Sequence, residues 1–131
     1  MTSMEIRYNV QVHQNHVGLD VFELGMVRPP KADISIFLTG NIATINAFHS
    51  YERKGGYGNG ALYGGLLWLL KNGLNVITGG IMRDKNYLYN VDWYINRGFT
   101  VDSDGKLSGD VSRAFSRCDD IRRVWKDTIK V

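Results

Sequence analysis

Cysteine is nearly absent from this sequence of 131 residues, which contains only Cys118. A single cysteine forms no internal disulfide and anchors no cysteine metal cluster, so we expect no metal. The first twenty residues contain no apolar run, and no stretch approaches the roughly 18 apolar residues that a membrane span requires. We therefore expect a soluble, cytoplasmic protein without a secretory signal and without a membrane partner.

A strong excess of one charge is also lacking. The chain has 16 Lys and Arg against 13 Asp and Glu, a formal net charge of +3. This balance is too mild to indicate nucleic acid as a partner, and the basic residues near the C-terminus alternate with aspartates, as on a solvated face. His13-x-x-His16 has a weak metal spacing without obvious partner ligands, so a surface position is favoured.

Length and composition indicate one domain over residues 1–131. The apolar content of 44% is ordinary for a globular protein and allows a real core. No internal repeat, low-complexity tract or linker divides the chain.

Strand patterns fill the first half of the sequence. Residues 6–12 alternate with the period of a strand, and residues 17–24 form a second candidate after a turn. Pro29-Pro30 marks a loop. Residues 33–38 and 42–49 flank Thr39-Gly40-Asn41, which predicts a hairpin.

Helices alternate with strands in the second half. The apolar pattern predicts helices over residues 59–72, 87–96 and 107–118, and strands over residues 75–82, 99–101 and 121–129. This order is typical of an α+β (α/β) domain, with a mixed, mostly antiparallel central sheet and flanking helices.

The most specialised stretch is Arg53-Lys54-Gly55-Gly56-Tyr57-Gly58-Asn59-Gly60, between a predicted strand and a predicted helix. Glycines let the backbone turn sharply and bring its N–H groups close to a ligand. The start of the following helix offers unpaired N–H donors and a partial positive charge. With two basic residues at its entrance, the loop is suited to a phosphate-bearing cofactor.

Two common phosphate loops fit this stretch poorly. A P-loop needs Gly-Lys followed by Ser or Thr, which is absent. Gly58-Asn59-Gly60 and Gly64 loosely resemble a dinucleotide fingerprint, and Asp84 follows the next predicted strand. That fold begins with βαβ units, whereas the first half here contains only strands. For Gly64 and Gly65, close packing of the helix on the sheet is favoured over contact with a ligand.

A third interpretation of the glycine-rich stretch accounts for more residues of the chain. The segment from Arg53 to Gly58 matches Q/R-x-x-G-x-G/A, the pyrophosphate loop of the Gcn5-related N-acetyltransferases. Asn86, Trp93-Tyr94 and Arg97-Gly98-Phe99 match the later N…(F/L)-Y-x-x-x-G-F segment of that family. The chain thus resembles this family over about residues 33–101. The resemblance implies an acyl-CoA N-acyltransferase fold with a shortened N-terminal half, because only a tight turn stands where the family has two helices.

The resemblance implies an N-acetyltransferase that moves an acetyl group from acetyl-CoA to an amine by direct attack in a ternary complex. The acceptor would be a small molecule or a protein, and a homodimer is one option for the assembly. The alternative is a catalytically inactive domain of the same fold that serves as a binding or structural module.

The resemblance also assigns site residues. Backbone N–H groups of the glycine loop would meet the coenzyme A pyrophosphate, and strand 42–49 would pair with the pantetheine arm. The implied cofactor-binding residues are Ala47, Phe48, His49, Arg53, Lys54, Gly55, Gly56, Tyr57, Gly58, Asn59 and Asn86.

Tyr94 matches the general acid of the family. A phenol with a pKa of about 10 can protonate a leaving thiolate, whose thiol has a pKa of about 8.5. Packing as a buried aromatic residue is the alternative for Tyr94. The general base is open among Glu23, Asp33, His49, Glu52 and Asp84, of which His49 and Glu52 rank first.

Overall fold

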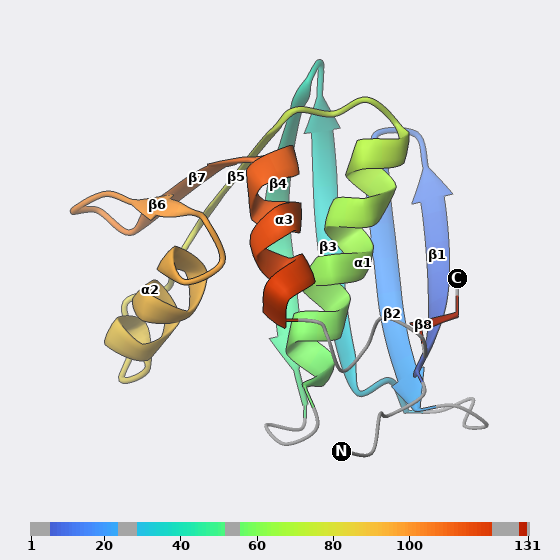
Figure 1. Cartoon of the computed structure of the whole chain (residues 1–131), viewed down its shortest axis with the longest axis horizontal. Coiled ribbons are helices and arrows are strands. Elements are labelled where there is room, and N and C mark those ends of the chain that lie inside the picture. Colours follow the sequence, from blue (N-terminus) through green and yellow to red (C-terminus); the bar gives the residue numbers. More distant parts are fainter. Residues whose placement is uncertain (1–5, 24–28, 52–55, 122–128, 131) are drawn as a thin grey trace.

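The computed structural model describes residues 6–23, 29–51, 56–121 and 129–130 of the chain. The elements in chain order are β1 (Ile6–His13), β2 (His16–Glu23), β3 (Ala32–Thr39), β4 (Ile42–Ser50), α1 (Tyr57–Lys71), β5 (Val76–Gly80), α2 (Tyr87–Ile95), β6 (Thr100–Val101), β7 (Lys106–Asp110), α3 (Val111–Ile121) and β8 (Ile129–Lys130). The strands form one sheet in the order β6-β7-β5-β4-β3-β2-β1-β8 (Figure 1).

The first four strands form an antiparallel meander, as the alternating pattern predicts. A tight turn at Gln14 and Asn15 joins β1 to β2, and the hairpin between β3 and β4 turns at Gly40, where φ is 60°. These strands have eight or nine residues each. The expectation of a shortened N-terminal half is therefore not supported, because this half supplies a full set of long strands.

The second half adds the mixed part of the sheet. Along the chain, α1 follows β4 and β5 follows α1. Strand β5 pairs with β4 in parallel and with β7 antiparallel. Since most neighbouring strands run antiparallel, the predicted fold class is confirmed.

One sequence prediction near the C-terminus was wrong over its first residues, and a second is tested only at its two ends. The helix predicted over residues 107–118 begins only at Val111, because residues 106–110 form β7 and satisfy their backbone groups on β5. The Asp110 carboxylate accepts a hydrogen bond from the Arg113 N–H at 2.9 Å, which is typical of a helix N-cap. Of the strand predicted over residues 121–129, Ile121 ends α3, residues 122–128 lie outside the described residues, and Ile129 begins β8.

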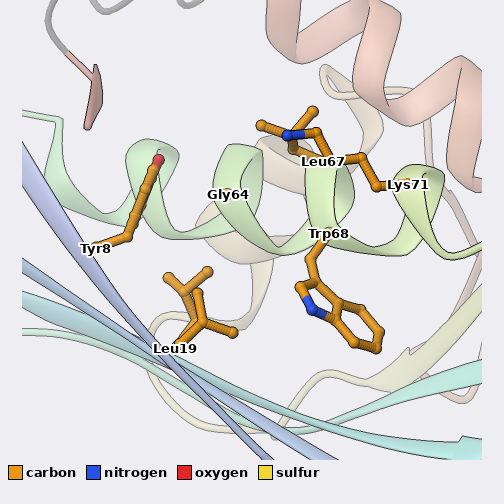
Figure 2. A pocket seen from close by; sticks show the side chains of 7 residues that line it. Tyr8, Leu19, Gly64, Leu67, Trp68 and Lys71 are labelled. Carbon is orange, nitrogen blue, oxygen red and sulfur yellow. The ribbon is translucent and has the colours of Figure 1, made fainter. Parts of the chain in front are cut away.

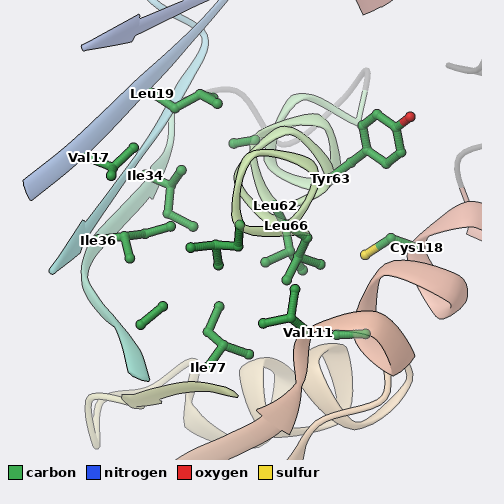
Figure 3. Close-up of a cluster of buried hydrophobic side chains, with 14 of the residues drawn as sticks. Val17, Leu19, Ile34, Ile36, Leu62, Tyr63, Leu66, Ile77, Val111 and Cys118 are labelled. Atoms are coloured by element: carbon green, nitrogen blue, oxygen red, sulfur yellow. The ribbon is translucent and has the colours of Figure 1, made fainter. Parts of the chain in front are cut away.

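The hydrophobic core lies between the sheet and two helices, α1 and α3, which cover the same face (Figures 1 and 3). Ile34 and Ile36 of β3 and Leu62 and Leu66 of α1 are almost completely buried at its centre. Cys118 of α3 is also fully buried, so the single thiol serves packing.

Helix α1 lies very close to β1. A Cβ atom on Gly64 would stand 2.7 Å from Cζ of Tyr8, and the Tyr8 hydroxyl donates a hydrogen bond to the carbonyl of Gly60. The packing interpretation of Gly64 is thus confirmed. Beside this contact is a small apolar cavity of about 40 Å³, lined partly by Leu19 and Trp68 (Figure 2). It is far too small for a cofactor.

The opposite face of the sheet carries polar side chains. By strand alternation, this face presents Asn9, Gln11, Asp20, Asp33, Ser35, Thr44, His49 and Thr78. We call it the open face, because α1 and α3 lie on the other side (Figure 1). Among the parts of the chain that the structure describes, no helix is long and apolar enough to cross a membrane.

Candidate functional site

Helix α1 begins without a side-chain cap. Its N-cap, Gly56, adopts a left-handed conformation with φ of 72° and ψ of 21°, and as a glycine it has no side chain that could cap the first turn. The first intrahelical bond of α1 runs from the Gly60 N–H to the Gly56 carbonyl at 3.0 Å. The N–H groups of Tyr57, Gly58 and Asn59 therefore make no hydrogen bond within the helix, and they form the positive end of its dipole.

Gly58 brings this helix start close to the end of β4. A Cβ atom on Gly58 would lie 3.3 Å from both Cβ and Oγ of Ser50, so a larger side chain would crowd the contact. The next residue along, Asn59, is only 6% exposed, and its Nδ2 is buried without a hydrogen-bond partner among the described residues. Since buried amide donors are nearly always satisfied, this atom indicates a missing acceptor at the start of α1.

Arg97 ties the start of α1 to the end of α2. Its Nε donates to Oδ1 of Asn59 at 2.9 Å, and its Nη1 donates to the carbonyl of Trp93 at 2.9 Å. The guanidinium also stacks 3.7 Å from the centroid of the Trp93 ring. Burial lowers the pKa of Arg97. In the sequence, Arg97 was identified only as part of the motif with Gly98-Phe99, and this link was not predicted.

Lys31 is a second residue that the sequence did not reveal. Its Nζ lies 6.0 Å from the centroid of the Tyr57 ring, which brings a cation to the first residue of α1. The predicted site residues Glu52, Arg53, Lys54 and Gly55 lie outside the described residues. The signal that could have found Lys31 is its position directly before β3, whose partner strand β4 leads into the glycine loop.

Strands β4 and β5 pair only over a short stretch. Their register runs from Ile42 with Val76 to Thr44 with Thr78, and β5 then runs obliquely away toward α2 (Figure 1). A bulge in the β3–β4 ladder follows, where Ser35 pairs with Ala47 and Ile36 pairs with Ile45. The edge of β4 from Ala47 to His49 therefore has no paired strand on the β5 side among the described strands, an opening in the strand pairing where backbone groups can meet a ligand.

Aromatic rings fill the helix side of this opening. The Phe48 ring packs edge-on against Trp93 at 5.8 Å and against Tyr94 at 6.5 Å between centroids, and Tyr94 packs on Phe99 at 5.3 Å. Burial raises the pKa of Tyr94 to about 12, partly opposed by the charge of Arg97. Tyr94 is thus both packed and protonated at neutral pH, so it can donate a proton.

His49 lies on the other side of the same strand. Because consecutive strand residues alternate, His49 faces the open face while Phe48 faces the helices. Its Nδ1 is 2.9 Å from Oδ1 of Asp33, and the Tyr51 hydroxyl donates to Oδ2 of Asp33 at 2.6 Å. Two of the five candidate bases, Asp33 and His49, are therefore in direct contact.

The remaining candidates lie elsewhere. Oδ1 of Asp84 accepts a hydrogen bond from the Asn86 N–H at 2.8 Å, just before α2, and Glu23 is exposed at the end of β2. Asn86 is the N-cap of α2, about 12 Å along the helix axis from Tyr94, so the link to α1 at the other end of α2 does not include it. Among the described side chains, no group of three or more His, Cys, Asp or Glu could hold a metal ion.

No protein-family model matches the sequence, and no curated protein matches it. Solved structures do match. The ribosomal-protein-S18-alanine N-acetyltransferase of Escherichia coli is 13% identical, with a TM-score of 0.64 over 76% of this chain and 72% of that chain. The PaiA N-acetyltransferase of Thermoplasma acidophilum, solved with coenzyme A, is 17% identical, with a TM-score of 0.61 over 73% and 61%.

A third similar structure is a CoA-dependent acyl-homoserine lactone synthase bound to SAM and isopentyl-CoA. It is 10% identical, with a TM-score of 0.65 over 90% of this chain and 69% of that chain. The protein therefore has the fold of the Gcn5-related N-acetyltransferases, as the two sequence motifs indicated.

Proposed function

We propose that this protein is an acetyl-CoA-dependent N-acetyltransferase, which transfers the acetyl group to an amine on a small molecule or protein. The observation that carries the proposal is the uncapped start of α1, which lies beside the end of β4 and contains the unpaired Nδ2 of Asn59. Coenzyme A bound to similar folds, as in the Thermoplasma acidophilum structure, supports the same reading.

The residues present fit a coenzyme A thioester. Its pyrophosphate would be held by the N–H groups of Tyr57, Gly58 and Asn59, with Nδ2 of Asn59 as a further donor and Lys31 as a nearby cation. Arg53, Lys54 and Gly55 directly precede Gly56 in the sequence and belong to the same binding motif. The β4 edge at Ala47, Phe48 and His49 would bind the pantetheine arm, and Asn86 remains a more distant candidate.

The bound thioester supplies an electrophilic carbonyl carbon, and the residues of the chain supply positioning and proton transfer. The backbone N–H near Phe48 would polarise the carbonyl oxygen. His49 would accept the proton that the amine loses as its nitrogen bonds to the carbonyl carbon and the carbon–sulfur bond breaks. Tyr94 would give a proton to the departing sulfur, and solvent would return one to Tyr94 and remove one from His49. Glu52 is the other candidate base.

A melting experiment tests the binding step. Acetyl-CoA at 100 times its Kd should stabilise the fold by about 2.7 kcal/mol, because it binds only the folded protein. If millimolar acetyl-CoA does not change the melting temperature, the proposal is wrong. If the shift is present, release of free thiol with a panel of amines, and with acetyl-, propionyl- and isopentyl-CoA, tests the transfer and the choice of acyl group.

A non-catalytic binding module of the same fold is the second candidate. Large apolar side chains stand exposed around the start of α2, where Met82 and Leu88 are each 77% exposed and Tyr89 is 67% exposed. Such a surface is typical of contact with a partner. Stabilisation by coenzyme A without thiol release across the amine panel would favour this candidate.

A further inference from the structure

We infer that Asp33 is a positioning residue for His49, which fixes the proton on Nδ1 and leaves Nε2 as the atom that accepts the proton of the amine. This inference rests on the proposed function for the role of His49, and it assigns a task to a carboxylate on the neighbouring strand.

The register of the sheet holds the pair together. Asp33 and His49 are direct cross-strand partners on β3 and β4, and their side chains meet on the open face at 2.9 Å. The His49 side chain is 57% exposed and that of Asp33 is 24% exposed. The imidazole is thus accessible to an acceptor, while the carboxylate beneath it is more enclosed.

Hydrogen bonding decides which nitrogen carries the proton. A carboxylate has only acceptor atoms, so Nδ1 of His49 must be the donor to Oδ1 of Asp33. Neutral imidazole carries a single ring proton, and Nε2 is then left with a free lone pair. Tyr51 holds the carboxylate from its other side through Oδ2, and this hydrogen bond raises the pKa of Tyr51. The Tyr51 ring also stacks on His49 at 5.8 Å between centroids.

The location of the pair suits proton removal from an acceptor. Phe48 directs its ring toward Tyr94 on the helix side, whereas His49, the next residue, faces the open face. The base and the acid therefore lie on opposite sides of the β4 edge. An amine can approach from the open face while the thiol leaves on the helix side. His49 Nε2 takes the amine proton as the N–C bond forms, and Tyr94 supplies the proton that the sulfur takes as the C–S bond breaks.

Asp20 provides a matched control on the same face. It is the cross-strand partner of Asp33 on β2, and burial together with the charge of Asp33 raises its pKa. Asp20→Ala removes a carboxylate from the same face without removing the acceptor at His49. A general field effect would appear in both variants, whereas positioning of the imidazole would be lost only in Asp33→Ala.

The direct experiment is ¹⁵N NMR of the imidazole rings, recorded where the rings are neutral, with the His49 signal assigned through His49→Gln. Wild type and Asp20→Ala should show a protonated Nδ1 and an unprotonated Nε2. Asp33→Ala should lose this preference. A wild-type proton on Nε2, or an unchanged tautomer in Asp33→Ala, would overturn the inference. Asp33→Leu serves as the second variant if Asp33→Ala does not fold.

Turnover gives the second readout. Asp33→Ala should lower kcat about 10- to 100-fold with the KM for acetyl-CoA within about twofold, which is less than the 10²- to 10⁴-fold typical of a general base. His49→Ala combined with Asp33→Ala should be no slower than His49→Ala alone. Full activity of Asp33→Ala would contradict the inference. Failure of the wild-type protein to bind acetyl-CoA would instead contradict the proposed function. The tautomer experiment would still decide whether Asp33 positions the imidazole of His49.

Discussion

Arg97 Nε lies 2.9 Å from Oδ1 of Asn59, so a residue just past the end of α2 holds a side chain in the first turn of α1. The same guanidinium binds the Trp93 carbonyl and stacks on the Trp93 ring. One side chain thus fixes the distance between the helix start that would bind pyrophosphate and the aromatic cluster that contains Tyr94. This contact joins Arg97 of the second sequence motif to the residue that directly follows the first motif.

The first prediction concerns Arg97→Lys. Lysine keeps the charge but loses the planar group that makes two directed hydrogen bonds and the stacking contact. We expect a loss of about 1–3 kcal/mol in the free energy of unfolding and weaker binding of acetyl-CoA. Urea unfolding and calorimetric titration measure the two effects. A variant as stable as wild type would show that the contacts of Arg97 do not contribute to the free energy of unfolding.

The second prediction concerns Gly58→Val. The added side chain would meet Ser50 within 3.3 Å and cover the N–H groups at the start of α1. We expect the thermal shift with acetyl-CoA to disappear while the far-ultraviolet circular dichroism stays unchanged. Gly18→Ala is the control, because its Cβ would lie 3.7 Å from the nearest atom and Gly18 belongs to β2, away from the start of α1. Its ligand shift should equal that of wild type, and retained binding in Gly58→Val would contradict the proposed cradle.

The third prediction compares two neighbouring glycines of α1. A Cβ on Gly64 would lie 2.7 Å from Tyr8, whereas a Cβ on Gly65 would lie 3.4 Å from its nearest neighbour, Ile36. Gly64→Ala should destabilise the fold by about 1–3 kcal/mol through overpacking. In Gly65→Ala, the gain of about 1 kcal/mol in helix propensity should offset the contact with Ile36, so this variant should be close to neutral. Equal unfolding midpoints in urea for the two variants would refute this difference.

Periodicity in the sequence was sufficient for the strands up to Ser50 and for the helix after the glycine loop. The helix prediction failed at residues 107–110 for a physical reason. Leu107 and Gly109 belong to a strand, but together with Val111 and Ala114 this stretch also has the apolar spacing of a helix. Pairing with β5 settled the outcome, and such pairing depends on residues about thirty positions earlier. The cap at Asp110 is the local signal that marks the change.

Motifs singled out part of the candidate site, and the contacts between its residues could not be predicted. Gly56, Gly58 and Tyr94 lie in motifs with fixed spacing, so sequence alone pointed to them. The contacts Asp33–His49 and Asn59–Arg97 join residues 16 and 38 positions apart, and nothing in the local sequence specifies such neighbours. They arise from strand register and from helix packing, which only the folded chain provides.

The fourth prediction is a loss of stability at high pH. The pKa of Tyr94 is about 12 in the folded state, against about 10 for an unfolded tyrosine. Its contribution is therefore fully present below pH 10 and is lost as the pH rises from about 10 to about 12, by up to about 3 kcal/mol. Urea unfolding at pH 9 and pH 11 measures the loss. Tyr94→Phe should show a smaller loss over this interval, and an equal loss would exclude Tyr94 as its source.

The fifth prediction concerns the same substitution in catalysis. Tyr94→Phe removes the hydroxyl but keeps the ring that packs on Phe48 and Phe99. We expect kcat to fall about 10²-fold, within the range for loss of general acid catalysis, while the thermal shift with acetyl-CoA stays within error of wild type. Because burial raises the pKa of Tyr94 to about 12, the wild-type enzyme should keep its acid form well above pH 9.

An acyl donor with a better leaving group separates this role from packing. If Tyr94 protonates the departing sulfur, an acyl donor whose thiol has a lower pKa should depend less on the hydroxyl, and the gap between wild type and Tyr94→Phe should narrow. Phe99→Leu is the packing control, since it disturbs the ring that Tyr94 contacts at 5.3 Å and leaves the hydroxyl in place. A gap of equal size for both donors would assign Tyr94 to the aromatic cluster alone and leave the thiolate to solvent.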